Sequence, residues 1–343
     1  MNTRKPIGIG IIGTGGWARE FWAGAQKAPE VRLVACWNRT RERAKQFAER
    51  YGGEVALSLE ALLENPEVEA VANFAANTYH CEPTLKAAAA RKHVLVDKPI
   101  ANTIEESAEM IRACRKAGVV LMVGHSSRYG GSARALKSLL DSGRLGQLAM
   151  VEAHTSHSGG ARLSEDRWRW HWDEAPGGPL MQLSIHAFDT LHCLFGPTRR
   201  VTALSKRDLL PSEIEDVFLA LLEFESGLLG YVGTNYLCPP ANFTRVYGRG
   251  GNAYGERSKL VFWKPKDDWS VEPEEIPLSE INPHAAEMSE FARAIRSGTE
   301  PETGGKEGLL ALGVVWACIK SAEENRTIEV REVLGDAAAL AYQ

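Results

Sequence analysis

A lysine and a histidine, far apart along the chain, could together carry out proton and hydride chemistry on an alcohol. Lys98 follows the apolar run Val94–Val96, which predicts a buried strand, and Pro99 ends that strand because proline lacks an N–H donor. His186 lies four residues after Gln182, so a helix would present both on one face. An imidazole could take a hydroxyl proton there, since its pKa lies near working pH. Taken alone, both residues also fit ordinary roles, as a loop lysine and a structural histidine.

A glycine-rich turn follows the first predicted strand. The strand Ile7–Ile12 runs into residues 13–18, GTGGWA, which have the spacing G-x-G-x-x-A, and a helical pattern comes next. Gly13 permits the tight turn, Gly15 lets backbone approach a pyrophosphate, and Ala18 lets helix pack on strand. The helix N-terminus then offers free N–H groups to phosphate. Strand, motif, helix and second strand in this order predict a dinucleotide-binding βαβ unit.

The residues after the second predicted strand bear on the choice of cofactor. An acidic residue about 20 positions beyond the glycine motif would hold the ribose 2′-hydroxyl of NAD and repel a 2′-phosphate. After Val31–Trp37 this chain has Asn38-Arg39-Thr40-Arg41 instead. A neutral amide followed by arginine removes the repulsion and offers a charge-assisted contact to phosphate, which slightly favours NADP. Arg39 and Arg41 would also fit solvated charges at a helix start.

Residues 1–125 alternate predicted strands with predicted helices. Strands are expected at 7–12, 31–37, 68–74, 93–97 and 119–123. Such alternation predicts a parallel, doubly wound sheet with right-handed crossovers. We therefore expect an α/β dinucleotide-binding domain of the Rossmann type over 1–125.

Residues 126–343 have a different pattern. Strand-like runs begin at Leu148 and recur at 201–204, 217–224, 228–232, 244–247 and 259–263, with turns rather than long helices between them. They predict a large, mostly antiparallel open sheet, flanked by helices over 132–140, 285–296 and 306–324. The fold class is thus α/β followed by α+β, and we expect residues 126–343 to form a domain for substrate binding and oligomerisation.

Size and composition are those of an ordinary soluble protein, which we expect in the cytoplasm. The 343 residues exceed what one core usually fills, and a net charge of −4 gives no basic footprint for nucleic acid. No apolar run could cross a membrane, and the start lacks a secretory apolar region. The six scattered cysteines predict reduced, mostly buried thiols. His154 and His157 would face opposite ways on a strand, so no metal site is expected.

The order G-x-G-x-x-A, a strand ending before His80, D-K-P at 97–99 and V-G-H at 123–125 resembles the glucose-fructose oxidoreductase / inositol dehydrogenase family, over nearly the whole chain. Those enzymes are NAD(P)-dependent, act mostly on sugars, cyclitols or their derivatives, and place an E-K-P lysine beside the nicotinamide. The resemblance implies cofactor contacts from Gly13, Thr14, Gly15, Gly16, Trp17, Ala18, Asn38, Arg39, Ala75, Asn77, His80, Asp97, Lys98 and Arg128.

The chain departs from the family pattern at several positions. Asp97 replaces the usual Glu, and Ala75-Ala76 replaces Thr-Pro, which would leave backbone-only cofactor contacts there. The stretch around His186 looks like the family's G-G-G-x-L-x-D-x-G-x-H-x-x-D, whose Asp and His flank the reacting alcohol, but Gln182 occupies the Asp position. Glutamine can hydrogen-bond a hydroxyl but cannot act as a base. Acid–base work is therefore expected from His186 and Lys98.

The expected function is hydride transfer between NAD(P) and a secondary alcohol or ketone of a sugar, cyclitol or related polyol. Lys98 and His186 are the expected catalytic pair, meeting over one carbon atom, and Arg169 and Gln182 join them in substrate binding. The tryptophans of Trp168–Trp172, if extended, would share one face for a sugar or for a core or subunit contact. An NAD-dependent redox-assisted glycosidase and a non-catalytic nucleotide-binding regulator are the alternatives. Similar proteins imply a homodimer or homotetramer.

Overall fold

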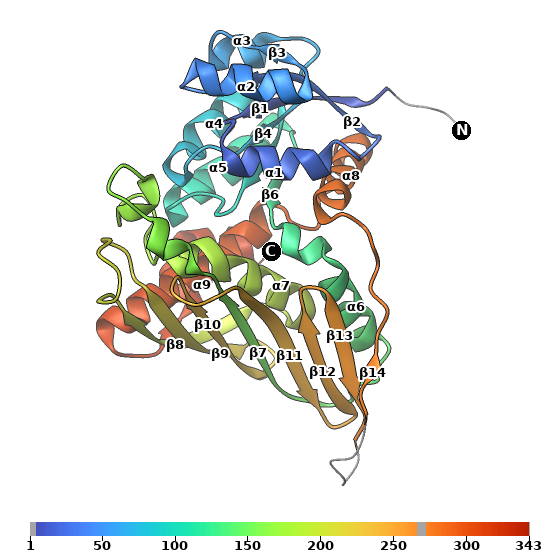
Figure 1. Cartoon of the computed structure of the whole chain (residues 1–343), viewed down its shortest axis with the longest axis vertical. Coiled ribbons are helices and arrows are strands. Elements are labelled where there is room, and N and C mark those ends of the chain that lie inside the picture. The colour runs from blue at the N-terminus through green and yellow to red at the C-terminus, as the bar shows by residue number, and fades with distance from the viewer. Residues whose placement is uncertain (1–4, 266–271, 343) are drawn as a thin grey trace. The chain divides into compact units, whose positions relative to one another are not determined.

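The computed structural model describes residues 5–265 and 272–342, and the chain divides into two compact units (Figure 1). The first comprises Met1–Ser126, Asn282–Leu309 and Ala339–Gln343. The second comprises Ser127–Ile281 and Leu310–Ala338. The first division falls beside the expected boundary at 125/126. The expected division did not include the return of a late segment, 282–309, to the first unit.

Helices and strands alternate early in the chain, and strands dominate its middle. The helices are α1 (Gly16–Ala25), α2 (Arg41–Tyr51), α3 (Leu59–Glu64), α4 (Cys81–Ala89), α5 (Ile104–Ala117), α6 (Gly131–Asp141), α7 (Ile185–Phe195), α8 (Pro283–Ser297), α9 (Gly305–Glu324), α10 (Val330–Leu334) and α11 (Ala338–Ala341). The strands are β1 (Ile7–Ile12), β2 (Val31–Trp37), β3 (Glu54–Val55), β4 (Ala70–Asn73), β5 (His93–Asp97), β6 (Leu121–Gly124), β7 (Leu148–Ser156), β8 (Thr198–Lys206), β9 (Val217–Phe224), β10 (Leu229–Asn235), β11 (Ala241–Gly248), β12 (Gly251–Glu256), β13 (Lys259–Trp263), β14 (Glu274–Glu275) and β15 (Ile328–Glu329).

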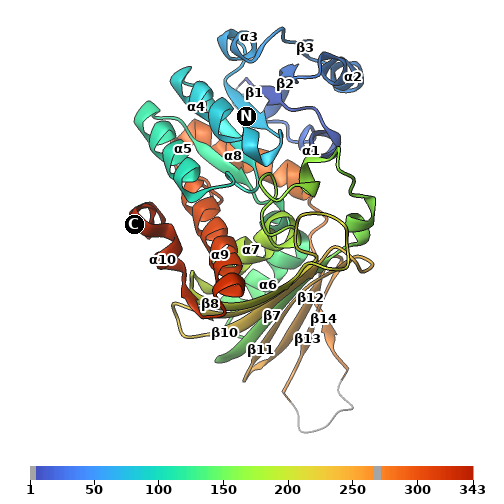
Figure 2. The same cartoon turned by 90° about the vertical axis from the view of Figure 1, so that its left-hand side faces the viewer.

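The first unit is built on a six-stranded sheet in the order β3-β2-β1-β4-β5-β6, in which every pair is parallel. Strands β1 and β4 are buried along their whole length, as expected of strands covered on both faces. Helices α4 and α5 lie side by side on one face, and α1 lies beside α8 on the other (Figure 2). The predicted doubly wound sheet is confirmed. Its topological switch point, where such sheets bind ligands, lies at the carboxyl ends of β1 and β4.

Helix α8 brings residues from late in the chain onto α1. Asn282 caps α8, its side chain accepting hydrogen bonds from the backbone N–H groups of His284 and the next residue. Gly24 of α1 packs against that cap, since a Cβ there would lie 2.6 Å from Asn282 Oδ1. The His284 ring meets Trp17 edge-on, with 5.5 Å between ring centres, and lies 4.9 Å from Phe21. The late segment therefore supports the residues that follow the glycine turn.

The second unit contains a nine-stranded sheet in the order β14-β13-β12-β11-β7-β10-β9-β8-β15. Only β7 and β10 pair in parallel, so the predicted mostly antiparallel sheet is confirmed. Helices α6 and α7 and the part of α9 from Leu310 onward cover one face (Figure 2). The strands also carry large hydrophobic side chains that are exposed, namely Met150, Leu204, Leu219, Leu221 and Leu229.

The six cysteines, all of them within the described residues, form no disulfide, and Cys36, Cys81, Cys114 and Cys318 are buried. Burial raises the pKa of the Cys36 and Cys81 thiols to about 11, so both are protonated at neutral pH. Within 5–265 and 272–342, no helix is both long enough and apolar enough to span a bilayer.

Candidate functional site

The glycine turn lies at the carboxyl end of β1, at the switch point of the first sheet. Gly13 has a φ of +80° and touches the next loop, because a Cβ there would lie 2.7 Å from the Ala75 backbone nitrogen. The space around Gly15 and Gly16 is open, since a Cβ on either would meet no described atom within 4 Å. No described side chain caps α1, and its first turn holds no acidic residue. The turn therefore fits an anionic group such as a pyrophosphate.

The loop after β4 supplies an unsatisfied polar group. Asn73, the last residue of β4, holds the loop by accepting from the Ala75 backbone N–H (3.1 Å) and donating to the Tyr79 carbonyl (3.1 Å). Asn77 is buried, and its Nδ2 has no hydrogen-bond partner among the described residues. Leaving a buried amide unpaired costs free energy, so this group fits a ligand acceptor. Sequence reasoning selected Asn77 but missed Asn73, whose signal was a polar residue inside an apolar strand.

His80 links this loop to the D-K-P turn. Its Nδ1 lies 2.8 Å from the Pro99 carbonyl oxygen and its Nε2 lies 3.3 Å from the Ala75 carbonyl oxygen. Burial lowers the pKa of His80, and the nearby Asp97 carboxylate opposes that change. A neutral imidazole has one N–H and can donate to only one of these carbonyls. The ring therefore fixes the backbone that follows Lys98.

Asp97 and Lys98 end β5 inside the same cluster. Burial raises the pKa of Asp97, against the opposing effects of Lys98, His80 and the Trp17 indole N–H. Gly124 pairs with Asp97 across the sheet, and a Cβ there would lie 3.2 Å from Asp97 Oδ1. Only 9% of Lys98 is exposed, so this residue is largely buried. The structure thus brings four predicted residues of the first unit together at one edge of the sheet, namely Ala75, His80, Asp97 and Lys98.

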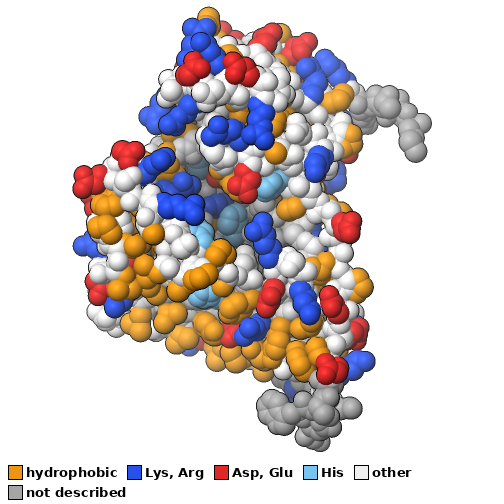
Figure 3. Space-filling view, in the orientation of Figure 1, with side chains coloured by type: hydrophobic (Ala, Val, Ile, Leu, Met, Phe, Trp, Pro, Cys, Tyr) orange, Lys and Arg blue, Asp and Glu red, His pale blue; other side chains and the backbone are white. Residues whose placement is uncertain are grey.

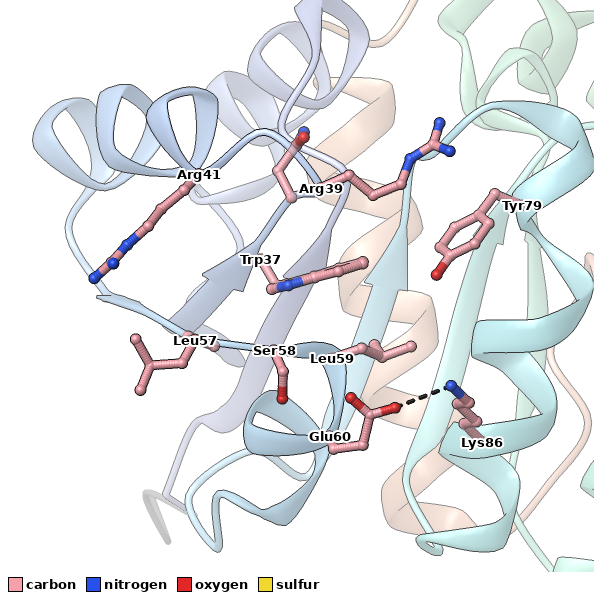
Figure 4. Close-up of a pocket in the computed structure, with 11 residues that line it drawn as sticks. Trp37, Arg39, Arg41, Leu57, Ser58, Leu59, Glu60, Tyr79 and Lys86 are labelled. Atoms are coloured by element: carbon pink, nitrogen blue, oxygen red, sulfur yellow. Dashed lines mark hydrogen bonds and ion pairs between the residues drawn. The ribbon is translucent and has the colours of Figure 1, made fainter.

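A cavity of about 490 Å³ lies beyond the end of β2 (Figure 4). The Arg39 guanidinium lies over the Tyr79 ring, 5.2 Å from its centre. Asn38 Nδ2 donates to Thr14 Oγ1 over 3.1 Å, which connects the cavity to the glycine turn. The cavity is lined by Trp37, Asn38, Arg39, Arg41, Ala56, Leu57, Ser58, Leu59, Glu60, Tyr79 and Lys86.

The charges around this cavity are unequal. Lys86 is paired with Glu60 (2.9 Å) and Glu82 (2.8 Å), and hydrogen bonds to both carboxylates raise its pKa. Arg39 and Arg41 form no ion pair with any residue in the described ranges. Figure 4 shows Arg39 beside Tyr79 and Arg41 at the far end of the cavity. Flat rings and two guanidinium groups without a described carboxylate partner suit an aromatic base attached to a phosphorylated sugar.

The predicted substrate residues of the second unit lie on and beside α7. A π-helical turn, Leu180–Ser184, runs directly into that helix and carries the buried Gln182. Gln182 Oε1 accepts a hydrogen bond from Arg169 Nε (3.3 Å). Trp168–Trp170 forms a 3-10 turn, so the common face that an extended segment would give its tryptophans is not formed. Arg169 and Gln182 are therefore neighbours, which their sequence positions did not predict.

Arg128 forms a buried ion pair in the second unit. Its Nη2 lies 2.6 Å from Asp189 Oδ1, and its Nε donates to Asp189 Oδ2 over 3.0 Å. Asp189 follows His186 by three residues on α7. The pair therefore anchors the helix that carries His186, and the expected contact of Arg128 with a cofactor stays a prediction.

We looked for side chains that could together bind a metal ion. The described ranges contain no group of three or more His, Cys, Asp or Glu side chains placed to hold a metal ion. His154 and His157 instead stack on different aromatic rings, Phe243 (5.6 Å between centres) and Tyr236 (5.1 Å).

Two family models match the chain. Residues 7–125 match the model of an oxidoreductase family with an NAD-binding Rossmann fold, and residues 133–254 match the model of the C-terminal domain of the Gfo/Idh/MocA proteins.

Among curated relatives, 1,5-anhydro-D-fructose reductase of Ensifer adhaerens is 29% identical over 94% of this chain and 98% of its own length. Myo-inositol 2-dehydrogenase of Thermotoga maritima is 24% identical over 95% of this chain and 99% of its own.

Solved structures share the whole architecture. A provisionally assigned NADPH-dependent oxidoreductase from Desulfitobacterium hafniense superposes with a TM-score of 0.92 at 32% identity, over 97% of this chain and 100% of the other. Levoglucosan dehydrogenase, solved with NADH and levoglucosan, superposes with a TM-score of 0.87 at 20% identity, over 95% and 100%. At that lower identity the likeness concerns the fold alone.

Proposed function

Because the chain belongs to the Gfo/Idh/MocA oxidoreductase family, we propose that it transfers hydride between a nicotinamide dinucleotide and a CH–OH group of a sugar, cyclitol or related polyol. The observation that carries this proposal is the cluster in the first unit. An open glycine turn, the unpaired amide of Asn77 and the buried Lys98 lie at one edge of the sheet. The two curated relatives are named for an anhydro-sugar and a cyclitol, which supports the substrate class.

We propose a separate role in the reaction for each of the residues His186, Lys98 and Gln182. A bound nicotinamide supplies the site that gives or receives hydride. In the oxidation direction, His186 takes the hydroxyl proton, and Lys98 donates a hydrogen bond to the oxygen as it becomes negative. Gln182, a neutral amide, binds a substrate hydroxyl without acting as a base. Gly15, Gly16 and the first turn of α1 hold the pyrophosphate.

We infer a preference for NADP over NAD. The position that would carry an acid in an NAD enzyme is Asn38, whose amide is turned to Thr14. Arg39 and Arg41 line the adjoining cavity without a carboxylate partner among the described residues, and either guanidinium can bind a 2′-phosphate in two-pronged fashion.

We also propose that the protein works as a homodimer or homotetramer through the sheet of the second unit. Figure 3 shows hydrophobic side chains gathered over this sheet, where Leu204, Leu219 and Leu221 are each more than half exposed. Apolar patches of this kind mark protein contacts. Leu221→Glu should lower the mass of the assembly measured by sedimentation. Ile281→Glu, at an exposed residue outside the strands, should leave that mass unchanged. Equal masses for both variants would contradict this interface.

The activity is tested by a screen of sugars and cyclitols with NAD and NADP, and of the matching ketones with the reduced cofactors. The absorbance of the reduced nicotinamide is the readout. Lys98→Met should bind cofactor nearly as well as the wild type and lose turnover by orders of magnitude. Lys137→Met, which removes an exposed ammonium paired with Asp141, is the matched control. Unchanged turnover in Lys98→Met would refute the role of Lys98, and cofactor binding without turnover of any compound would refute the activity.

A further inference from the structure

The guanidinium of Arg169 is held in one orientation by two neutral neighbours. Its Nε donates to Gln182 Oε1 over 3.3 Å, and its Cζ lies 4.3 Å from the centre of the Trp168 ring. An exposed arginine normally samples many rotamers, and ordering it costs conformational entropy. Here the stacking and the hydrogen bond fix the plane of the group, while the residue as a whole stays exposed. The guanidinium is thus prepared for a further partner.

The positive charge of Arg169 is not neutralised by the chain. No described carboxylate lies within ion-pair distance of it. Asp166 instead binds Ser164 and Arg167, and Glu213 binds His171. The neighbouring Tyr236 stays neutral as well, because burial raises its pKa. A fixed cation that has neutral contacts and no ion pair among the described residues favours an anion.

We propose that Arg169 receives an anionic group of the substrate, a carboxylate or a phosphate, so that the natural substrate is a sugar acid, a sugar phosphate or a similarly charged polyol. With Nε engaged, four N–H donors on Nη1 and Nη2 remain, in the planar arrangement that suits carboxylate and phosphate oxygens. Gln182, which orients the guanidinium, precedes His186 by about one turn. The anion therefore binds next to the helix that carries the proposed proton acceptor. This inference rests on the proposed function for the site as a whole.

The substitution at position 182 is part of the argument. A carboxylate there would accept the same hydrogen bond from Arg169 Nε and would neutralise its charge. The amide of Gln182 keeps the geometry and leaves the charge available. A neutral sugar could offer the guanidinium only hydroxyl groups, whereas a carboxylate or phosphate adds an opposite charge and a two-pronged contact.

The test compares matched ligands by calorimetry on the enzyme saturated with oxidised cofactor. D-glucose, D-glucuronate and D-glucose 6-phosphate form one set, and D-galactose, D-galacturonate and D-galactose 6-phosphate form another. We expect at least one anionic member to bind on the order of tenfold more tightly than its neutral counterpart, with a preference that weakens as ionic strength rises. The carboxylate and phosphate members separate the two possible anions.

Two variants and a control connect that preference to Arg169. Arg169→Gln and Gln182→Glu should each abolish it, the second by supplying an internal counter-charge. Arg162→Gln, which alters another exposed arginine of the same loop, should retain it. The proposal is overturned if neutral members bind as tightly as anionic ones, if no anionic member binds, or if the preference survives in Arg169→Gln. Anion binding by a protein that turns over no compound of the full substrate screen would instead leave this site standing and refute the oxidoreductase activity.

Discussion

Arg128 donates hydrogen bonds to both carboxylate oxygens of Asp189, three residues beyond His186 on α7. Both side chains are buried, so neither charge is compensated by water. Removing one partner of such a pair leaves the other buried and unpaired, which is costly. The position of the His186 helix in the second unit therefore depends on Arg128, which lies in a 3-10 turn, Ser126–Tyr129.

Arg128→Met should lower the free energy of unfolding by about 3–5 kcal/mol, measured by urea denaturation. Arg128→Lys should recover only part of this, because an ammonium cannot donate to both oxygens in the same planar geometry. Lys137→Met, at the exposed pair with Asp141, should change stability little. A variant of Arg128 with normal stability and weakened cofactor binding would instead support the cofactor contact that the family resemblance implies.

Adding a methyl group to two glycines of the same turn should have different effects, a loss of stability at Gly13 and a loss of cofactor binding at Gly15. Gly13→Ala forces alanine to a φ of +80° and against the Ala75 backbone, so we expect a stability loss of at least about 1–3 kcal/mol. Gly15 has a φ of −71° and open space, so Gly15→Ala should fold with nearly normal stability. Its methyl group would enter the space in which we propose that the pyrophosphate binds, so a fluorescence titration should show weaker NADPH binding. Normal NADPH affinity in folded Gly15→Ala would contradict the assigned phosphate site.

The cavity beside β2 predicts how cofactor preference can be altered. Arg39→Ala should weaken NADPH binding by on the order of tenfold while leaving NADH binding nearly unchanged, because only NADPH carries the 2′-phosphate. Asn38→Asp should shift preference in the same direction by repelling that phosphate. Arg43→Ala is the control, because it removes a charge from α2, four residues after Arg39 and outside the cavity lining. Equal losses for both cofactors in Arg39→Ala would indicate that the arginine contacts the base rather than the phosphate.

Acid should destabilise the first unit through His93. Its Nδ1 accepts a hydrogen bond from the Val120 backbone N–H over 3.0 Å, and burial lowers the pKa of His93. The unfolded chain, with a histidine pKa of about 6.5, therefore takes up this proton first as pH falls. The stabilisation is present above about pH 6.5 and is lost as pH falls from there toward the lowered pKa.

His93→Asn tests this account, since its Oδ1 can accept the same bond without titrating. The unfolding free energy of the variant should depend less steeply on pH below about 6.5 than that of the wild type. Replacing His171 is the opposite control, because a hydrogen bond to the Glu165 carbonyl raises the pKa of this histidine, whereas burial lowers that of His93. An unchanged slope in His93→Asn would show that other groups dominate the acid response.

The sequence predicted the elements that local patterns determine. The strand expected at 31–37 and the strand expected at 93–97 match β2 and β5, because apolar runs bounded by turn residues determine such strands. Strand β12 (GNAYGE) was missed because two glycines and polar residues hide its alternation. The π-helical turn at 180–184 was also missed, since its residues favour helix without specifying the type.

Contacts between distant residues could not be predicted in the same way. Arg169 and Gln182 were each selected from the sequence, but their hydrogen bond depends on a 3-10 turn and a π-helical turn that no local pattern specifies. The ion pair of Arg128 likewise joins residues 61 positions apart. Asn73 was overlooked because its role lies in holding a loop rather than in reacting.

The packing of α8 on α1 sets an order of events during synthesis. The six parallel strands are synthesised well before Asn282 and His284. Until those residues are made, the side of α1 at Gly24 and Trp17 lacks its contacts with them. A nascent chain that stops at Ser126 lacks the surface that completes this layer. The contact between α1 and α8 can therefore form only after Pro283–Ser297 has been synthesised.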